Sequence, residues 1–273
     1  MLYEEVEIIW KKIYSETSIL IKEEPYLYNF YNSYILKHNS LIDSMSYILA
    51  DKLFDDFISR TQMKKMISKL YLHNPIMSIY AVQDINFIIQ TDPVVNYFHI
   101  PFLYFKGFHA LQGYRISNYL WSQGRKSLAM YFQSKISQRF SIDIHPAAKI
   151  GSGIILDHGT GIVIGETVVI ENHVSILQSV TIGSRYSILG NRHPIIREGT
   201  IIGAGAKILG NIEIGSFSKI GSGAVVLNSV PSYSTVVGIP GKIISKSHNE
   251  VLNPINQNNS FSHSIDFQYG SGI

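Results

Sequence analysis

The sequence contains no cysteine among its 273 residues. Disulfide bonds, thiolate metal sites and a cysteine nucleophile are therefore excluded. It also lacks any apolar run of the roughly 18 residues that a membrane-spanning helix needs. Charge of one sign is not concentrated either, since 23 basic and 20 acidic residues give a net charge of +3. A clustered basic face is typical of nucleic-acid-binding proteins, so we expect neither a nucleic-acid nor a membrane partner.

The start of the chain is acidic rather than basic, with Glu4, Glu5 and Glu7 among its first ten residues. A secretory signal peptide begins with a basic segment followed by an apolar one. With no export signal of this kind, we expect a cytoplasmic protein. Apolar residues make up 45% of the chain, which is enough for a sizeable core and argues against disorder.

Residues 1–140 have the apolar periodicity of helices. Asn74-Pro75 and Asp92-Pro93 interrupt this pattern, and the residue before a proline disfavours helical backbone, so we expect breaks between helices there. Residues 105–121 and 128–140 form two further amphipathic stretches. Packing in a helical core explains these apolar stripes without any other function.

The period changes to six from residue 142 onward. Six matches neither an α-helix nor a simple strand, but it fits a short strand plus a turn, three of which make one triangular coil of a solenoid. The row runs in two blocks separated by a gap of sixteen, which predicts a loop of about ten extra residues near 184–194. The first block is Ile144, Ile150, Leu156, Ile162, Val168, Val174 and Val180, and the second is Ile196, Ile202, Ile208, Ile214, Ile220 and Val226.

A second aliphatic row overlies the first block, at Ile164, Ile170, Ile176 and Ile182. Periodicity alone leaves open which of the two rows is innermost. The overlap indicates a register shift of two residues around 157–161. The hexapeptide pattern itself resembles the left-handed parallel β-helix of acyltransferases.

Transfer of an acyl group to an alcohol needs a base for the hydroxyl proton, and histidine is the usual one. Asp143 and His158 are fifteen residues apart, close to one coil of about eighteen residues. A carboxylate on the second imidazole nitrogen fixes the tautomer of such a base. The alternative is purely structural, with His158 in a turn and Asp143 at the start of a strand.

Several longer stretches closely resemble bacterial serine acetyltransferases. The similarity runs from about residue 92 to 242 and returns at the C-terminal end, and it includes Leu-Asp-His-Gly-Thr-Gly-Ile-Val-Ile-Gly-Glu-Thr over 156–167. The other stretches are 105–116, 143–151, 170–183, 192–199 and 202–213. This resemblance implies an α+β chain with three parts. They are a helical oligomerisation domain (1–140), a left-handed parallel β-helix with one expelled loop (141–245) and a flexible C-terminal tail (246–273).

The resemblance implies the transfer of acetyl from acetyl-CoA to the L-serine hydroxyl, with no permanently bound cofactor and no metal. His158 is then the general base and Asp143 its orienting partner. Asp157 and Asp92 hold the substrate ammonium. For Asp92, a helix cap before Pro93 is the competing explanation.

The remaining site residues follow from the same resemblance. Arg192 and His193 bind the substrate carboxylate, which suits a guanidinium, and His193 also helps with the oxyanion. A solvated loop is the alternative for this pair. The acetyl-CoA site is implied between adjacent prisms, near Gly183, Ala204 and Lys219.

Assembly and partners are also implied by the resemblance. A trimer with sites between subunits suits a short prism, and the helical domain joins two trimers into a homohexamer. The terminal Ile273 implies binding to O-acetylserine sulfhydrylase, since a C-terminal carboxylate is a known recognition feature. One departure from the family is the 184–191 loop, usually glycine-rich, which here carries Arg185, Tyr186, Ile188 and Leu189.

Three other functions compete with this interpretation. A metal-dependent β-helix hydratase needs three histidine ligands, but the histidines of the repeat region form no clear triplet by spacing. A catalytically weak scaffold that regulates the sulfhydrylase through its tail is the non-enzyme alternative. A sugar or homoserine acceptor is the third, although paired carboxylates opposite an arginine fit an amino acid better. The histidines concerned are His145, His158, His173 and His193.

Overall fold

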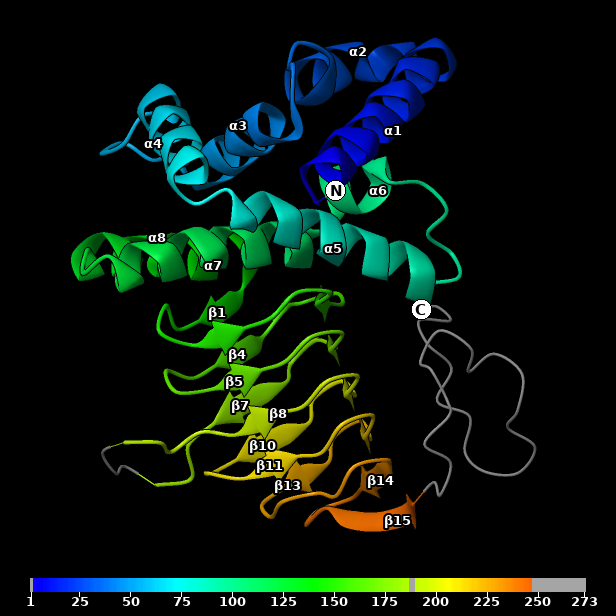
Figure 1. Cartoon of the computed structure of the whole chain (residues 1–273), viewed down its shortest axis with the longest axis vertical. Helices are drawn as coiled ribbons and strands as arrows, with labels where there is room; N and C mark the ends of the chain where they lie inside the picture. The colour runs from blue at the N-terminus through cyan, green and yellow to red at the C-terminus, as the bar shows by residue number, and fades with distance from the viewer. Residues whose placement is uncertain (1, 187–189, 247–273) are drawn as a thin grey trace.

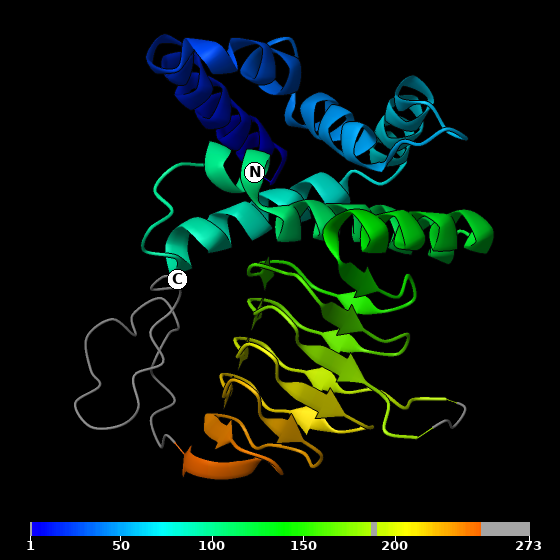
Figure 2. The same ribbon diagram turned by 180° about the vertical axis from the view of Figure 1, so that it is seen from behind.

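The structure, a computed structural model, describes residues 2–186 and 190–246. It has two parts stacked along the long axis, a helical region and a β-solenoid (Figure 1). Seen from behind, α5, α7 and α8 lie across the N-terminal end of the solenoid, and α1 to α4 lie beyond them (Figure 2). No helix within the described ranges is long and apolar enough to cross a membrane.

Helices occupy the chain up to Phe140. The expected breaks are confirmed, since α4 ends at His73 before Asn74-Pro75 and α5 ends at Thr91 before Asp92-Pro93. A short 3₁₀ turn (Pro25–Leu27) and a π-helical turn (Asn32–Leu36) flank α2. The α-helices are α1 (Leu2–Glu23), α2 (Tyr28–Tyr31), α3 (Leu41–Leu53), α4 (Arg60–His73), α5 (Ile76–Thr91), α6 (His99–Tyr104), α7 (Lys106–Ser122) and α8 (Lys126–Phe140).

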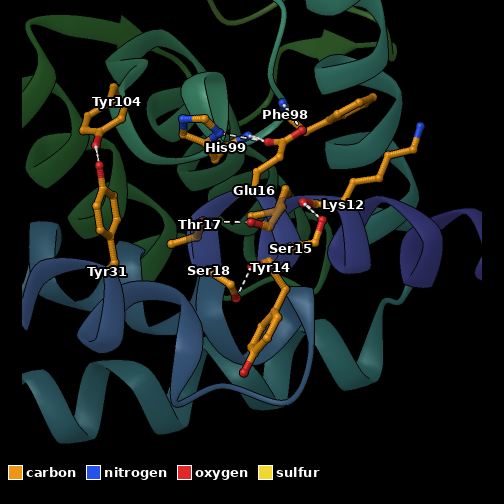
Figure 3. A network of polar contacts seen from close by, with 11 residues as sticks. Lys12, Tyr14, Ser15, Glu16, Thr17, Ser18, Tyr31, Phe98, His99 and Tyr104 are labelled. Carbon is orange, nitrogen blue, oxygen red and sulfur yellow. Dashed lines mark hydrogen bonds and ion pairs between the residues drawn. The ribbon is translucent and has the colours of Figure 1, made fainter. Parts of the chain in front are cut away.

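A partly buried carboxylate ties the first helix to the short helix α6 (Figure 3). Glu16 on α1 accepts hydrogen bonds from the backbone N–H groups of Phe98 and His99, at 3.2 and 2.9 Å. Its Oε2 also lies 2.9 Å from His99 Nδ1. The first N–H groups of a helix have no partner within the helix, so Glu16 satisfies the start of α6 and fixes the segment that follows Asp92.

The solenoid has three faces, which we call A, B and C, each formed by a parallel sheet. Face C ends with the antiparallel pair β14–β15, which closes the last coil. Face A holds β1 (Ile142–Ile144), β4 (Ile162–Ile164), β7 (Thr181–Gly183), β10 (Lys207–Leu209) and β13 (Val225–Val226). Face B holds β2 (Lys149–Ile150), β5 (Val169–Ile170), β8 (Ile195–Ile196) and β11 (Glu213–Ile214). Face C holds β3 (Ile155–Leu156), β6 (Ser175–Ile176), β9 (Ile201–Ile202), β12 (Lys219–Ile220), β14 (Ser234–Val237) and β15 (Lys242–Lys246).

Strand pairing resolves the two aliphatic rows. Ile144 pairs with Ile164, twenty residues on, and Ile164 pairs with Ile182, eighteen residues on. The predicted two-residue shift is therefore confirmed, and after it the row continues through Ile164 rather than Ile162. Both residues are buried, because positions two apart in a strand point to the same side.

The predicted size of the expelled loop was wrong. Ile182 pairs with Ile208, twenty-six residues on, which is eight more than the eighteen of a regular coil. The gap of sixteen was counted from Val180, in the first aliphatic row. After the two-residue shift, the equivalent position is Ile182, in the second row. The extra segment therefore holds eight residues rather than ten, and it lies between β7 and β8.

Candidate active site

Four of the predicted site residues lie at two different corners of the solenoid. His158 and Asp157 occupy the turn between β3 on face C and β4 on face A, which we call the C–A corner. Arg192 and His193 directly precede β8 on face B and so lie at the A–B corner, next to the expelled loop. Within one chain, these two groups flank opposite edges of face A.

The C–A corner brings two carboxylates and a histidine together. Asp157 Oδ1 lies 3.9 Å from His158 Nε2. Burial raises the pKa of Asp157, the charge of His158 opposes this, and the negative charge of Asp92 raises the pKa further. Asp92, at the end of α5, therefore acts on Asp157 through its charge although it is 65 positions earlier in the chain. Asp92 is also the C-cap residue of α5, and its carboxylate accepts a hydrogen bond from the Val94 N–H in the turn that follows. The expected cap position and the electrostatic effect on Asp157 therefore coexist.

His158 is held in an unusual backbone conformation that presents its ring to solvent. Its φ of 54° lies in the left-handed region, which is uncommon for a residue other than glycine. Its side chain is 67% exposed. An imidazole on a tight turn, with a carboxylate beside it and one face open, is accessible to a substrate hydroxyl.

The A–B corner fixes the protonation pattern of His193. The Thr167 N–H donates to His193 Nδ1 at 3.2 Å, and the Thr167 hydroxyl lies 2.8 Å from the same nitrogen. Burial, and then the charge of Arg192, lower the pKa of His193, which favours the neutral ring. A neutral ring that accepts at Nδ1 carries its proton on Nε2, so His193 offers an N–H donor.

Glu166 orients the guanidinium of Arg192. Arg192 Nη2 donates to Glu166 Oε2 at 2.7 Å, and this hydrogen bond is the largest cause of the lowered pKa of Glu166. Neither Glu166 nor Thr167 was identified as a site residue from the sequence. Both occur within a stretch that resembles the family, but they lie 26 residues from their partners across the expelled loop. Spacing along the chain gives no signal for such a pair.

Asp143 lies on β1 of face A, and its carboxylate accepts a hydrogen bond from Gln133 Nε2 at 2.7 Å. Within residues 2–186 and 190–246 of one chain, no hydrogen bond or ion pair joins Asp143 to His158. Burial lowers the pKa of His145, and Glu166 and Asp143 oppose that shift. Asp143 therefore acts electrostatically on His145, which follows β1 on the same side of face A as Glu166 and Arg192.

The predicted acetyl-CoA residues are divided between faces A and C and the corner that joins them. Gly183 ends β7, and a methyl group there would meet Leu209 and Thr181 only at ordinary contact distance. Ala204 lies in the turn after β9, at the C–A corner, and Lys219 lies on β12 of face C. Burial lowers the pKa of Lys219.

Parts of the predicted site fall outside the described residues. These are Ser187, Ile188 and Leu189 of the expelled loop and the tail that ends at Ile273. In the described part of the loop, the Arg185 guanidinium lies 5.3 Å from the Tyr186 ring centroid. Elsewhere in the described ranges, no group of three or more histidine and acidic side chains has the arrangement of a metal site.

Comparison with known proteins identifies the family. Residues 9–113 match the family model for the N-terminal region of serine acetyltransferase, and residues 193–228 match six repeats of the bacterial transferase hexapeptide. A serine acetyltransferase of Buchnera aphidicola from Acyrthosiphon pisum is 53% identical over 97% of both chains. The serine acetyltransferase of Escherichia coli K12 is 48% identical over the full length of both.

The chain belongs to the serine acetyltransferase family. Solved structures of serine acetyltransferases also match its fold. A structure described as a complex with CoA is 51% identical, with a TM-score of 0.85, and covers 88% of this chain and 100% of its own. A soybean structure described as complexed with serine is 41% identical, with a TM-score of 0.85, and covers 88% and 99%.

The serine acetyltransferase match confirms the predicted α+β fold, helical first and then a left-handed β-helix. It also spans both parts of the candidate site. The N-terminal family model includes Asp92, and the hexapeptide model begins at His193. In this member of the serine acetyltransferase family, the substrate-binding candidates thus come from the helical region as well as the solenoid.

Proposed function

We propose that this chain transfers the acetyl group of acetyl-CoA to the hydroxyl of L-serine, giving O-acetyl-L-serine and CoA. This reaction is the first step of cysteine biosynthesis from serine. The single observation that carries the proposal is the chemistry of the two corners. One corner offers His158 with two carboxylates, and the other offers an oriented guanidinium and a neutral histidine. An α-amino acid with a hydroxyl side chain matches that set of charges.

The reaction needs no enzyme nucleophile. His158 takes the proton of the serine hydroxyl as the serine oxygen attacks the thioester carbonyl carbon. The C=O bond opens to an oxyanion, and His193 Nε2–H is the proposed donor to it. When the intermediate collapses, the carbon–sulfur bond breaks, and the CoA thiolate takes the proton from the imidazolium of His158. The acetyl group is then bonded to the serine oxygen, and the proton taken from the serine hydroxyl is on the CoA thiol.

Substrate orientation is the proposed role of the other charged groups. Asp157 and Asp92 bind the ammonium of serine, since the repulsion between the two carboxylates is relieved by a cation between them. Arg192, oriented by Glu166, binds the carboxylate. Gly183, Ala204 and Lys219 remain the proposed contacts for acetyl-CoA, which acts as a co-substrate.

We infer that the complete site forms between subunits of a trimer. The two corners flank opposite edges of face A, so in a trimer the C–A corner of one subunit can face the A–B corner of the next. The charge of Asp143 acts on His145, on the A–B side of face A. Asp143 is therefore proposed to orient His158 of the neighbouring subunit. The helical region, with exposed Tyr26 and Tyr28 near α2, is the proposed contact between two trimers in a hexamer.

Two further elements of the proposal concern the cell. The enzyme is proposed to act in the cytoplasm, and its terminal Ile273 to bind O-acetylserine sulfhydrylase. A peptide ending in Ile273 and the same peptide with Ile273→Ala, compared for binding to the sulfhydrylase, test the second point. Equal binding by both peptides would remove Ile273 from that role.

The decisive experiment measures thiol release from acetyl-CoA with and without L-serine, using a thiol-reactive dye. The protein contributes no thiol of its own, because it has no cysteine. Release that depends on L-serine supports the proposed reaction. A folded protein that releases no thiol with L-serine would contradict it, and release with homoserine alone would reassign the acceptor.

A further inference from the structure

The first turn of α7 contacts both sides of the turn that carries His158. The Gly107 backbone lies so close to β3 that a Cβ atom on Gly107 would overlap the carbonyl oxygen of Leu156. On the other side of the turn, a Cβ on Gly159 would lie 3.5 Å from the Gly107 Cα. Gly107 therefore packs between the residues that immediately precede and follow Asp157 and His158.

A side chain adds a polar contact at the end of the same turn. The ammonium of Lys106, the first residue of α7, donates a hydrogen bond to the Thr160 hydroxyl. Lys106 and Thr160 are 54 residues apart, so only the packing of α7 on the solenoid brings them together. Thr160 is exposed, so its side chain takes no part in the packing of the solenoid core.

The other end of β3 is held by the helical region as well. Asp84 on α5 accepts a hydrogen bond from the Ile154 N–H at 3.0 Å and is itself fully buried. Arg115 on α7 donates to both carboxylate oxygens of Asp84, at 3.0 and 2.7 Å. Helices α5 and α7 thus fix β3 at its start and at its end, two residues before His158 with its left-handed backbone.

We propose that Lys106 and Gly107 are positioning residues for acetyl transfer, because they hold the turn of residues 157–160 and thereby set the direction of the His158 ring. The inference rests on the proposed role of His158 as the base. Neither residue needs to touch a substrate. Catalysis is sensitive to placement, and a displacement of about 1 Å costs roughly 100-fold in rate.

The test begins with two glycine substitutions in the same helix. Gly107→Ala puts a methyl group against a backbone oxygen, which cannot move without moving the turn. Gly113→Ala is the matched control, since its methyl group would meet the end of the Ile136 side chain at 2.9 Å, which can rotate away. We expect kcat to fall about 100-fold for Gly107→Ala and to stay within about twofold for Gly113→Ala.

A double-mutant cycle tests the polar contact by removing only the polar groups of the two side chains. Lys106→Met and Thr160→Val are each expected to lower kcat about 5- to 10-fold, and the double variant no further than either. Lys106→Arg, which keeps a donor, should restore most of the rate. The dissociation constant of CoA, measured by calorimetry, should stay unchanged, because a general loss of structure would alter it and a turned imidazole would not.

The outcomes separate this inference from the proposed function. Near-normal kcat in Lys106→Met and Thr160→Val, with His158→Ala inactive, would overturn the positioning role and leave the base assignment standing. Near-normal turnover in His158→Ala would instead remove the base assignment and the inference with it. If Gly107→Ala does not fold, the cycle decides alone, and strictly multiplicative effects of the two substitutions would count against the contact.

Discussion

The hydroxyl of Thr167 lies 2.8 Å from Nδ1 of His193, and the N–H of Thr167 donates to the same nitrogen. Two donors on Nδ1 leave the proton of the neutral ring on Nε2. The A–B corner therefore fixes the neutral tautomer of His193, with its proton on Nε2, whether or not a substrate is bound.

Removing the hydroxyl tests that arrangement. Thr167→Val keeps the backbone donor but removes the hydroxyl that binds His193 Nδ1 and accepts from the Arg192 N–H at 3.3 Å. We therefore expect kcat to fall by about 10-fold. Thr200→Val is the control, since its hydroxyl binds the Arg197 carbonyl oxygen at a corner away from face A. Steady-state kinetics of both variants provide the measurement, and equal rates would argue against the role of Thr167.

His158 is the residue on which turnover should depend most. His158→Ala is expected to lower kcat by at least ~100-fold while folding stays intact, in line with general acid–base catalysis. His173→Ala is a matched control, because His173 is also a half-exposed corner histidine with positive φ. Thiol-release rates and circular dichroism of both variants test this, and near-normal turnover of His158→Ala would exclude it as the base.

Mixed oligomers test whether sites form between subunits. His158→Ala and Arg192→Ala damage different corners, so each variant alone should be nearly inactive when L-serine is well below its KM. When the two are co-expressed and assemble randomly, about a quarter of the interfaces combine two intact corners. Recovery of about that fraction of wild-type activity supports a shared site. If each site lay within one chain, mixing would restore nothing.

The pair Glu166 and Arg192 should affect substrate binding more than the chemical step. Glu166→Gln replaces a charge-assisted hydrogen bond with a neutral one, so the guanidinium is held less firmly. We expect the KM for L-serine to rise about 10-fold with a smaller change in kcat. Glu171→Gln is the control, because Glu171 binds Arg197 in a similar pair at 2.6 Å on face B. An unchanged KM in Glu166→Gln would show that Arg192 needs no orienting partner.

A buried histidine on α7 should make stability depend on pH. Burial, and secondarily the charge of Lys52, lower the pKa of His109 from 6.5 to about 3. Between about pH 3 and pH 6.5, His109 is therefore protonated in the unfolded chain and neutral in the folded one. Its contribution to the free energy of unfolding is fully present above about pH 6.5. Below that pH, the free energy of unfolding should fall by up to about 1.4 kcal/mol per pH unit from this group.

His109→Gln removes that titration. Between pH 6.5 and 5, the free energy of unfolding of the variant is expected to fall less steeply than that of the wild type. The difference in slope corresponds to the uptake of about one proton on unfolding. Urea unfolding at several pH values, at one fixed protein concentration, measures the difference. Parallel curves for the two proteins would mean that His109 is protonated as easily in the folded state as in the unfolded one.

The local sequence determined where the helices and strands of this protein begin and end. A six-residue aliphatic period can be satisfied only by short strands joined by turns, and Asn74-Pro75 and Asp92-Pro93 end helices through their own backbone chemistry. These features depend on neighbouring residues alone. Resemblance to a family then supplied names for the site residues, including the histidine of the C–A corner.

Tertiary structure decided which of those residues meet. Successive coils contain twenty, eighteen and twenty-six residues between equivalent positions, and a constant period does not record that variation. It is this variation, together with the docking of α5 and α7 on the first coil, that brings Glu166 to Arg192, Lys106 to Thr160 and Asp92 to Asp157. Contacts between residues so far apart depend on how whole elements pack, and no local pattern along the chain encodes them.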